Sequence, residues 1–469
     1  MNSASGNKFV VAVVALLLVA AGCGAKGDSV AEGGGSGDSG GSETTEAPAG
    51  DAEANFGDIE APCGPGEATI DEGEAGQGTD KLYIGVNSDK GSDVRPGLLR
   101  ELWDASNAYI DWCNEQGGIA GLQIEAVDLD GKLFNVPQYL PTACNDVFAM
   151  VGGGSTFDDL QLKGSPNLEE CGQLDMAGFT VSKAKAEATD TYLAALPNPA
   201  QSRPASLYEY LAQAYPEESG DVAIAYGDLD TIRFVKDQTV AVMDKLGAPF
   251  KAGDEITYAV QGQDFKLISQ SIKGSGATMG TYIGEPANGG LLLNSLKEDG
   301  VTIPMFLEAN NYDPLLLDKG ANPAGDVLIR LPHAPFEEAE DYPAMQKFID
   351  LMDARKEKDD QTKTAALGIQ SMSSWLLFTQ AATACGSTGD KVISRDCIRE
   401  QVGEIGEWTG GGLHAPTNPG ENLPPKCVIV MTVDGDKFVR KFPEVGSDDA
   451  TDDGYYCPEE NAVVDIDVE

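Results

Sequence analysis

The chain has 469 residues, and its 76 acidic side chains outnumber its 32 basic ones to give a formal net charge of −44 at pH 7. Because a phosphate backbone repels so acidic a surface, the composition disfavours nucleic acid as a partner. Roughly 400 residues follow the polar N-terminal segment, which is more than one hydrophobic core usually serves, so two lobes are expected.

The first residues predict export from the cytoplasm. Lys8 is followed by an apolar run from Phe9 to Ala21, and then by Gly22 and Cys23. The run is shorter than the roughly 20 residues of a permanent transmembrane helix and is typical of a cleavable signal peptide, here residues 1–22. The small residues before Cys23 resemble a bacterial lipobox, so we expect Cys23 to carry the lipid that anchors an extracytoplasmic protein to the bacterial membrane, at the cell surface or in the periplasm. An ordinary secretory signal without lipidation is the alternative.

The segment 23–79 is expected to be a largely disordered tether. It is rich in Gly, Ser, Glu, Asp and Ala, and it has almost no large apolar residue before Phe56. Such a composition cannot bury enough apolar surface to offset the entropy of ordering. A G-x-S-x-G match at residues 37–41 lacks the packed strand and turn that a serine nucleophile needs, so we interpret it as accidental.

Eight cysteines remain besides Cys23, and an even count in an exported chain predicts four disulfides. No C-x-x-C pair is present, which gives no support for a zinc site, and no metal or cofactor is expected. Sequence alone does not fix the pairing. Closeness in the chain suggests Cys385 with Cys397 and Cys427 with Cys457, and for the remainder we expect Cys144 with Cys171 and Cys63 with Cys113.

Strands and helices alternate along the first part of the ordered chain. The clearest helix has apolar residues at three- and four-residue intervals from Leu98 to Trp112, and Gly117 and Gly118 end it. This rhythm predicts βαβ units around a parallel sheet. The expected elements are a strand at 81–86, a helix at 96–116, a strand at 122–127, a helix at 137–145, a strand at 147–151, a further helix and a weaker strand at 172–177.

The same rhythm begins again near Ser202, without any repeat in the sequence itself. After it come a long apolar helix at 365–384 and a hairpin whose turn is Asp434-Gly435-Asp436, since an Asp-Gly pair strongly favours such a turn. The elements expected in the second block are helices at 204–215, 231–246, 266–275 and 288–300, which alternate with strands at 221–226, 255–258, 278–283 and 304–308.

Residues 113–121, Cys-Asn-Glu-Gln-Gly-Gly-Ile-Ala-Gly, precede a strand and Asp128. This pattern resembles the type I periplasmic binding proteins of the leucine/isoleucine/valine-binding family, whose first helix ends in a similar Asn-x-x-Gly-Gly-Ile-x-Gly turn. The resemblance covers roughly residues 80 to 445. It implies an α/β fold of two doubly wound lobes with mainly parallel central sheets, joined by a three-strand hinge. Lobe 1 would hold 80–200 and 331–420, lobe 2 would hold 201–330 and 421–445, and an acidic tail at 446–469 would be tied by Cys457.

Ligands of open α/β sheets lie beyond the carboxyl ends of the strands, which directs attention to the residues there. Gly152-Gly153-Gly154 precedes Ser155 and Thr156 at an expected helix start, where hydroxyls and N–H groups can bind an anion. The resemblance implies that these two residues bind the α-carboxylate of an amino acid, and that Thr180, or else Ser182, supplies another hydroxyl to the ligand. It also implies that acidic and aromatic residues at three strand ends of lobe 2, Tyr226, Tyr282 and Glu308, meet the ammonium group. A helix cap without a ligand and a solvated glutamate are the alternatives.

The resemblance implies a receptor, not an enzyme, that captures a small polar solute, such as an amino acid or a related zwitterion or amide. The receptor would be a monomer and would deliver the solute to an ABC permease. A ligand-sensing lipoprotein of the same fold is the alternative. A secreted hydrolase is a third hypothesis, but no nucleophile, histidine and acid are spaced as in a catalytic triad. Residues 368–375 replace the Tyr-Asp-Ala pattern of the family, which leaves the identity of the ligand open.

Overall fold

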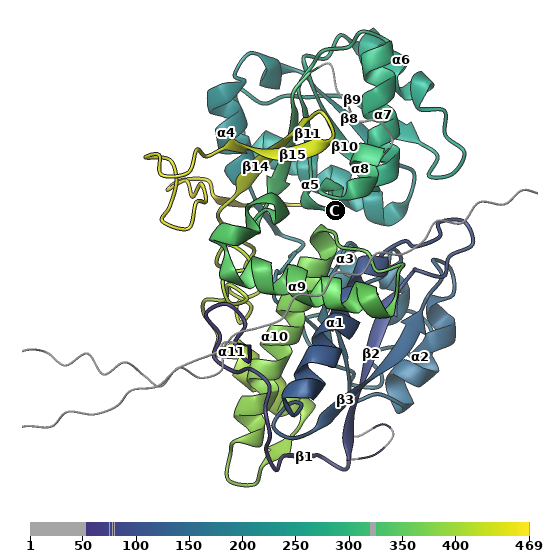
Figure 1. The fold of residues 1–469 in the computed structure, drawn as a ribbon. Coiled ribbons are helices and arrows are strands. Elements are labelled where there is room, and N and C mark those ends of the chain that lie inside the picture. The colour runs from purple at the N-terminus through teal and green to yellow at the C-terminus, as the bar shows by residue number, and fades with distance from the viewer. Residues whose placement is uncertain (1–52, 75, 77, 79, 319–324, 469) are drawn as a thin grey trace, which may run out of the picture. The chain divides into compact units, whose positions relative to one another are not determined.

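The computed structural model describes residues 53–74, 76, 78, 80–318 and 325–468. The expected signal peptide and the lipidation site Cys23 lie outside these residues. No helix in the described part of the chain is long and apolar enough to cross a membrane. The described residues form one compact unit that holds two central sheets (Figure 1).

The first sheet is parallel throughout and has the strand order β3-β2-β4-β5-β6. On one face, α1, α9 and α10 pack around Ile84 and Trp375, and on the other face α2 packs around Leu129 and Met150. The elements are β2 (Lys81–Ser88), α1 (Arg100–Gln116), β3 (Gln123–Asp130), α2 (Val136–Asn145), β4 (Ala149–Val151), β5 (Asp175–Ala177), α3 (Lys183–Glu187), β6 (Tyr192–Ala194), α9 (Pro343–Lys358), α10 (Ala366–Gly386) and α11 (Arg395–Gly403).

The second sheet has the order β15-β14-β12-β11-β10-β8-β9, in which β14 runs antiparallel to both of its neighbours and the other pairs are parallel. Helices α4 and α5 cover one face, and α6 and α7 cover the other. The elements are α4 (Ser206–Ala214), β8 (Val222–Gly227), α5 (Asp230–Leu246), β9 (Ala252–Tyr258), α6 (Phe265–Ser275), β10 (Met279–Ile283), α7 (Pro286–Glu298), β11 (Met305–Leu307), α8 (Pro314–Asp318), β12 (Val327–Leu331), β14 (Ile429–Asp434) and β15 (Lys437–Phe442).

Within the described residues the chain passes between the two sheets three times, between β6 and β8, between β12 and α9, and between α11 and β14. The second and third crossings lie side by side, because the N–H of Ala415 donates to the carbonyl of Pro332 at 2.8 Å. Beside the first crossing, β7 (Ser202–Pro204) pairs with β16 (Val463–Asp465). The expected α/β fold with mainly parallel sheets is thereby confirmed.

Four disulfides join the described cysteines, and they are the pairs expected from the sequence: Cys63–Cys113, Cys144–Cys171, Cys385–Cys397 and Cys427–Cys457. The turn motif after α1 also has the expected backbone. Gly117 and Gly118 have φ angles of 114° and 83°, and a Cβ on Gly118 would lie 2.1 Å from the carbonyl oxygen of Leu122. These positions therefore require glycine.

The expectation of a disordered tether up to residue 79 is wrong for residues 53–74. Phe56 is fully buried with its ring 6.0 Å from that of Trp112, and Cys63 is bonded to α1. Strand β1 (Thr69–Ile70) pairs in parallel with β13 (Val392–Ile393). A few apolar residues and one disulfide thus attach this segment to the first lobe, although the segment is polar on average.

One further expectation needs correction, and the C-terminal segment is packed more extensively than the expected tie at Cys457 alone requires. The helix expected after Gly152–Thr156 is a short 3₁₀ turn, η1 (Asp158–Leu162), so no long helix begins at those residues. The acidic C-terminal segment is packed on the second sheet, since Tyr455, Val464 and Ile466 are buried and β16 pairs with β7. The remaining 3₁₀ turns are η2 (Glu218–Gly220), η3 (Ala309–Asn311) and η4 (Phe336–Asp341).

Candidate ligand-binding site

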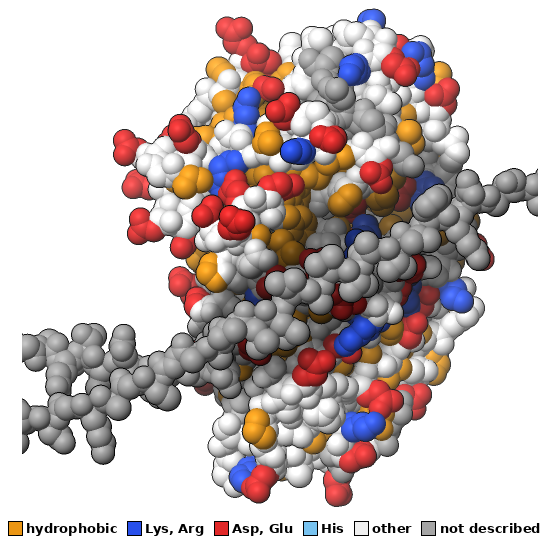
Figure 2. All heavy atoms as spheres, in the orientation of Figure 1, with side chains coloured by type: hydrophobic (Ala, Val, Ile, Leu, Met, Phe, Trp, Pro, Cys, Tyr) orange, Lys and Arg blue, Asp and Glu red, His pale blue; other side chains and the backbone are white. Residues whose placement is uncertain are grey.

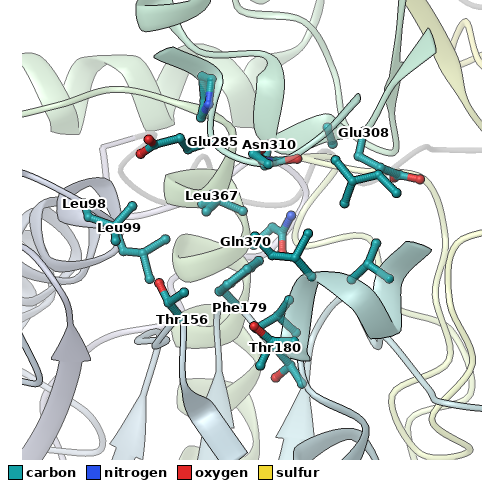
Figure 3. A pocket seen from close by; sticks show the side chains of 18 of the residues that line it. Leu98, Leu99, Thr156, Phe179, Thr180, Glu285, Glu308, Asn310, Leu367 and Gln370 are labelled. Atoms are coloured by element: carbon teal, nitrogen blue, oxygen red, sulfur yellow. The ribbon is translucent and has the colours of Figure 1, made fainter. Parts of the chain in front are cut away.

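A pocket with a volume of about 610 Å³ is lined by residues from the carboxyl ends of strands in both sheets. Figure 3 shows Thr156, Phe179 and Thr180 on one side of it and Glu285, Asn310 and Glu308 on the other. Leu367 and Gln370 of α10 lie between the two groups. The position is the one that open α/β sheets use for ligands.

Most of the pocket wall is apolar. This contrasts with the outer face in Figure 2, where acidic side chains are spread over the surface and hydrophobic ones gather near the middle. Such a wall favours a ligand with substantial apolar surface. The larger apolar residues that line the pocket are Val94, Leu98, Leu99, Leu133, Phe179, Val181, Leu196, Leu229, Ile232, Val235, Val260, Ile283, Leu291, Leu315 and Leu367.

The two residues expected to bind a carboxylate already contact one within the chain. Asp89 follows β2 and is fully buried, and its Oδ2 accepts a hydrogen bond from the N–H of Thr156 at 2.8 Å. Ser155 Oγ donates to the same oxygen at 3.4 Å, and Leu133 N–H donates to Asp89 Oδ1 at 2.8 Å. Burial raises the pKa of Asp89. Thr156 lines the pocket, whereas Ser155 is buried behind the wall.

The remaining predicted residues divide between the wall and the core. Thr180 lines the pocket, and its carbonyl accepts a hydrogen bond from Asn198 Nδ2 at 3.0 Å. Tyr226 is buried in the core that α4 and α5 form, where Lys236 Nζ lies 5.6 Å from its ring centroid. Tyr282 accepts from the Tyr258 hydroxyl at 2.9 Å and donates to the carbonyl of Glu285 at 2.9 Å. Tyr226 and Tyr282 therefore lie behind the pocket wall, whereas Tyr258 is part of the lining.

Glu308 lines the pocket, but arginines of the chain surround its carboxylate. Arg330 Nε and Nη2 donate to Glu308 Oε2 at 3.0 and 2.9 Å, and Arg203 Nη2 lies 3.5 Å from Oε1. Burial acts to raise the pKa of Glu308, but the two arginines outweigh it and hold that pKa below its ordinary value. The role expected for Glu308, contact with a ligand ammonium, would require displacement of these guanidinium groups.

Three other ion pairs flank the pocket. Arg95, in the loop after β2, lies 2.7 Å from Glu285, directly before α7, so this pair connects the two sheets. Lys363 contacts Glu101 at 3.0 Å and Asp313 at 2.7 Å. Burial acts to lower the pKa of Lys363, but these two carboxylates raise it above its ordinary value.

Arg203 and Arg330 were not among the residues predicted from the sequence. One signal was present, because Arg330 is the single charge in the apolar strand Val-Leu-Ile-Arg-Leu of β12. A charged side chain inside such a strand needs a partner, and the partner marks a polar site. Arg203 stands in β7, a strand of only three residues, and no local pattern distinguishes it.

A serine–histidine pair lies away from the pocket, in the interior. Ser373 Oγ is 2.8 Å from Nε2 of His414, and the other ring nitrogen of His414 lies 2.8 Å from the carbonyl of Ala415. Both side chains are buried, and burial lowers the pKa of His414 to about 4. A substrate in the pocket would not reach this serine, and the histidine is oriented by a carbonyl where a triad uses a carboxylate.

Comparison with known proteins agrees with this architecture. A family model described as periplasmic binding protein matches residues 81–437. No curated protein matches the chain.

Several solved structures share the fold. A fatty acid ABC transporter substrate-binding protein from Thermomonospora curvata is 16% identical with a TM-score of 0.61, over 78% of this chain and 92% of that one. A leucine-binding protein from Thermotoga maritima is 15% identical with a TM-score of 0.59, over 77% and 98%. An ABC transporter solute-binding protein from Rhodopseudomonas palustris, in complex with 3,4-dihydroxybenzoic acid, is 16% identical with a TM-score of 0.57, over 77% and 96%. Because the family model also spans most of the sequence, the chain belongs to the type I periplasmic binding proteins, the solute-binding components of ABC transporters.

Proposed function

We propose that this protein captures a small-molecule ligand in the pocket between its two lobes and delivers it to an ABC permease, without chemical conversion. The observation that carries the proposal is the pocket itself, which takes its lining from strand ends of both sheets. The Arg95–Glu285 pair supports the same proposal, because this ion pair joins the two lobes and would stabilise them when they close around a ligand. We retain the lobe boundaries given above, and the packing of α9 and α10 on α1 supports them.

The fold by itself does not select the ligand. By their names, the similar structures bind a fatty acid, leucine and 3,4-dihydroxybenzoic acid. An amino acid, or a related zwitterion or amide, is therefore one candidate class among several. The charges and the apolar wall of the pocket must decide between them.

We propose further that the protein acts as a monomer anchored outside the cytoplasm by a lipid on Cys23. The signal-like run before Cys23 supports the anchor, and the family to which the chain belongs is extracytoplasmic. The lipid would keep the receptor near its permease.

A thermal-shift screen of the full mature chain tests the proposed function. The compounds are amino acids, amides, carboxylic acids, sugars and polyamines. A ligand at about a hundredfold excess over its Kd stabilises the native state by about 2.7 kcal/mol, which should raise the Tm by about 3 °C in a protein of this size. If no compound of any class raises the Tm, the receptor function is contradicted. Turnover of a bound compound would contradict the absence of chemistry.

A further inference from the structure

The groups expected to hold a zwitterion are already paired within the chain. The N–H of Thr156, expected to bind a ligand carboxylate, donates to Asp89 at 2.8 Å. Glu308, expected to bind a ligand ammonium, is held by Arg330 and Arg203. A ligand that used either group would have to break a buried charged contact, which is costly. An amino acid therefore has no ready partner at the two positions that the sequence suggested.

The cluster of Arg203, Arg330 and Glu308 holds one positive charge in excess. Two guanidinium groups share one carboxylate, and all three side chains line the pocket. Both arginine side chains are nearly buried, at 10% and 12% exposure. Nη1 of Arg330 has no hydrogen-bond partner in the described part of the chain. A buried positive charge without a full complement of acceptors is stabilised by an anion, and a carboxylate can accept two parallel hydrogen bonds from a guanidinium group.

The other carboxylates near the pocket do not offer a free site for a cation. Glu285 is paired with Arg95 at 2.7 Å, and Glu101 and Asp313 share Lys363. Glu101 and Asp313 are also almost fully buried. Burial raises the pKa of Glu101, which favours its neutral form and reduces the negative charge of that group. A ligand ammonium would have to compete with a lysine or an arginine at each of these positions.

The remainder of the pocket is suited to an apolar body. Figure 3 places Glu308 on one side and Leu98 and Leu99 on the other, with Leu367 and Phe179 between them. A volume of about 610 Å³ exceeds the need of one small amino acid. We propose that the ligand is a monocarboxylic acid with an apolar body and no ammonium group, whose carboxylate pairs with Arg203 and Arg330 and whose body extends toward Leu98 and Leu99. This inference rests on the proposed function and names its ligand class.

Isothermal titration calorimetry of the full mature chain at pH 7.5 tests the ligand class. The probes are octanoate and 3-phenylpropanoate, compared with octanamide, octylamine and leucine. Loss of the charge-assisted hydrogen bonds should make octanamide bind about tenfold more weakly than octanoate. Octylamine and leucine should bind more weakly still. The two acids distinguish an aliphatic body from an aromatic one.

Two substitutions test the proposed contact. Arg203→Gln should weaken octanoate binding about tenfold or more. Glu308→Gln removes the internal competitor and should strengthen octanoate binding several-fold, because both guanidinium groups then become available. A glutamate that paired with a ligand ammonium would give the opposite sign. Arg399→Gln, on α11 and away from the pocket lining, is the matched control and should leave the affinity unchanged.

If the Arg203→Gln variant does not fold, the double variant with both Arg203→Gln and Glu308→Gln takes its place. The double variant removes the glutamate together with the arginine, so no carboxylate loses a partner. It should fold and should bind octanoate more weakly than the Glu308→Gln variant. Tighter binding of leucine or octylamine than of octanoate would overturn the ligand class and leave the receptor function intact. Failure of all five probes and of the full thermal-shift screen would overturn both. Loss of octanoate binding in a folded Glu308→Gln variant would also overturn the ligand class.

Discussion

At the scale of single residues, the neighbours of a charge decide its role in the pocket. Glu308 lies at the end of a strand in the pocket, as the sequence suggests, but Arg330 gives its carboxylate two hydrogen bonds. Asp89 was not among the predicted residues, yet it occupies the N–H of Thr156. The structure therefore places Glu308 in the pocket but gives its carboxylate a partner within the chain.

Asp158 is a buried carboxylate that orders the loop beside the pocket. Its oxygens accept hydrogen bonds from the N–H groups of Val181 at 2.9 Å and Ser182 at 3.1 Å, directly after the pocket residue Thr180. Burial raises the pKa of Asp158 to about 6 from an ordinary value of 3.8. The native state therefore binds the proton of Asp158 more tightly than the unfolded chain does. The free energy of unfolding that this contributes is fully present below pH 3.8 and is lost as the pH rises through about 6.

Asp158→Asn should remove this pH dependence. Between pH 4.5 and 7.5 the wild-type protein should lose about 2 kcal/mol of unfolding free energy that the variant retains. Guanidinium unfolding at the two pH values, with the disulfides intact, measures the difference. Asp159→Asn is the matched control, because Asp159 pairs with Lys163 at the surface. A gap between wild type and Asp158→Asn that stays constant with pH would contradict the expected role.

At the scale of elements, the start of α7 meets the loop between β2 and α1. Arg95 and Glu285 form the 2.7 Å contact, and their side chains are 27% and 24% exposed. The hydroxyl of Tyr282 donates to the carbonyl of Glu285, which orients the start of α7. A partly exposed ion pair of this kind stabilises the closed arrangement of the lobes only weakly. It therefore favours closure around a ligand but is too weak to keep the lobes closed without one.

Arg95→Gln and Glu285→Gln should each weaken the affinity for the ligand by about two- to fivefold, which is the usual size of a partly exposed ion pair. The double variant should bind no more weakly than either single variant, because the same contact is lost in all three. Isothermal titration calorimetry with the tightest ligand from the screen measures the cycle. Lys81→Gln is a control, since Lys81 pairs with Glu125 inside the first sheet. Additive losses in the double variant would show that the pair does not act as one interaction.

At the scale of the whole molecule, the protein must remain near its permease after export. A diacyl or triacyl anchor on Cys23 would hold it there, since two or more chains give stable membrane attachment. In a bacterial host, Cys23→Ser should abolish incorporation of labelled palmitate and release the protein from the membrane fraction. Unchanged ligand affinity and four intact disulfides in the released protein would serve as the control. Release of the wild-type protein without label would contradict the anchor.

The sequence determined the features that depend on neighbours in the chain. Apolar residues at helical spacing gave α1, the pair Gly117-Gly118 ended it, and Asp434-Gly435 joined β14 to β15. The alternation of strands and helices predicted two parallel-sheet lobes, which the structure confirms. These inferences succeed because hydrophobic periodicity and turn geometry act over only a few residues.

Composition was a poorer guide where a few contacts decide the outcome. Residues 53–74 are polar on average, yet Phe56 and the Cys63–Cys113 bond attach them to α1. The acidic C-terminal segment is likewise held by buried Tyr455 and by β16. The average composition of a segment does not show which distant residue each of its apolar side chains packs against.

The charges of the pocket are brought together by residues that lie far apart in the chain. The Asp89–Thr156 contact joins residues 67 apart in the chain, and the Glu308–Arg330 contact joins residues 22 apart. Arg203 enters the same cluster from the crossing beside β16. No local pattern encodes which charges meet, because the free energy of a buried charge depends on every group that packs around it. Local patterns and the turn motif after α1 therefore predict the kind of protein, whereas the packing of distant charges sets the electrostatics of its pocket.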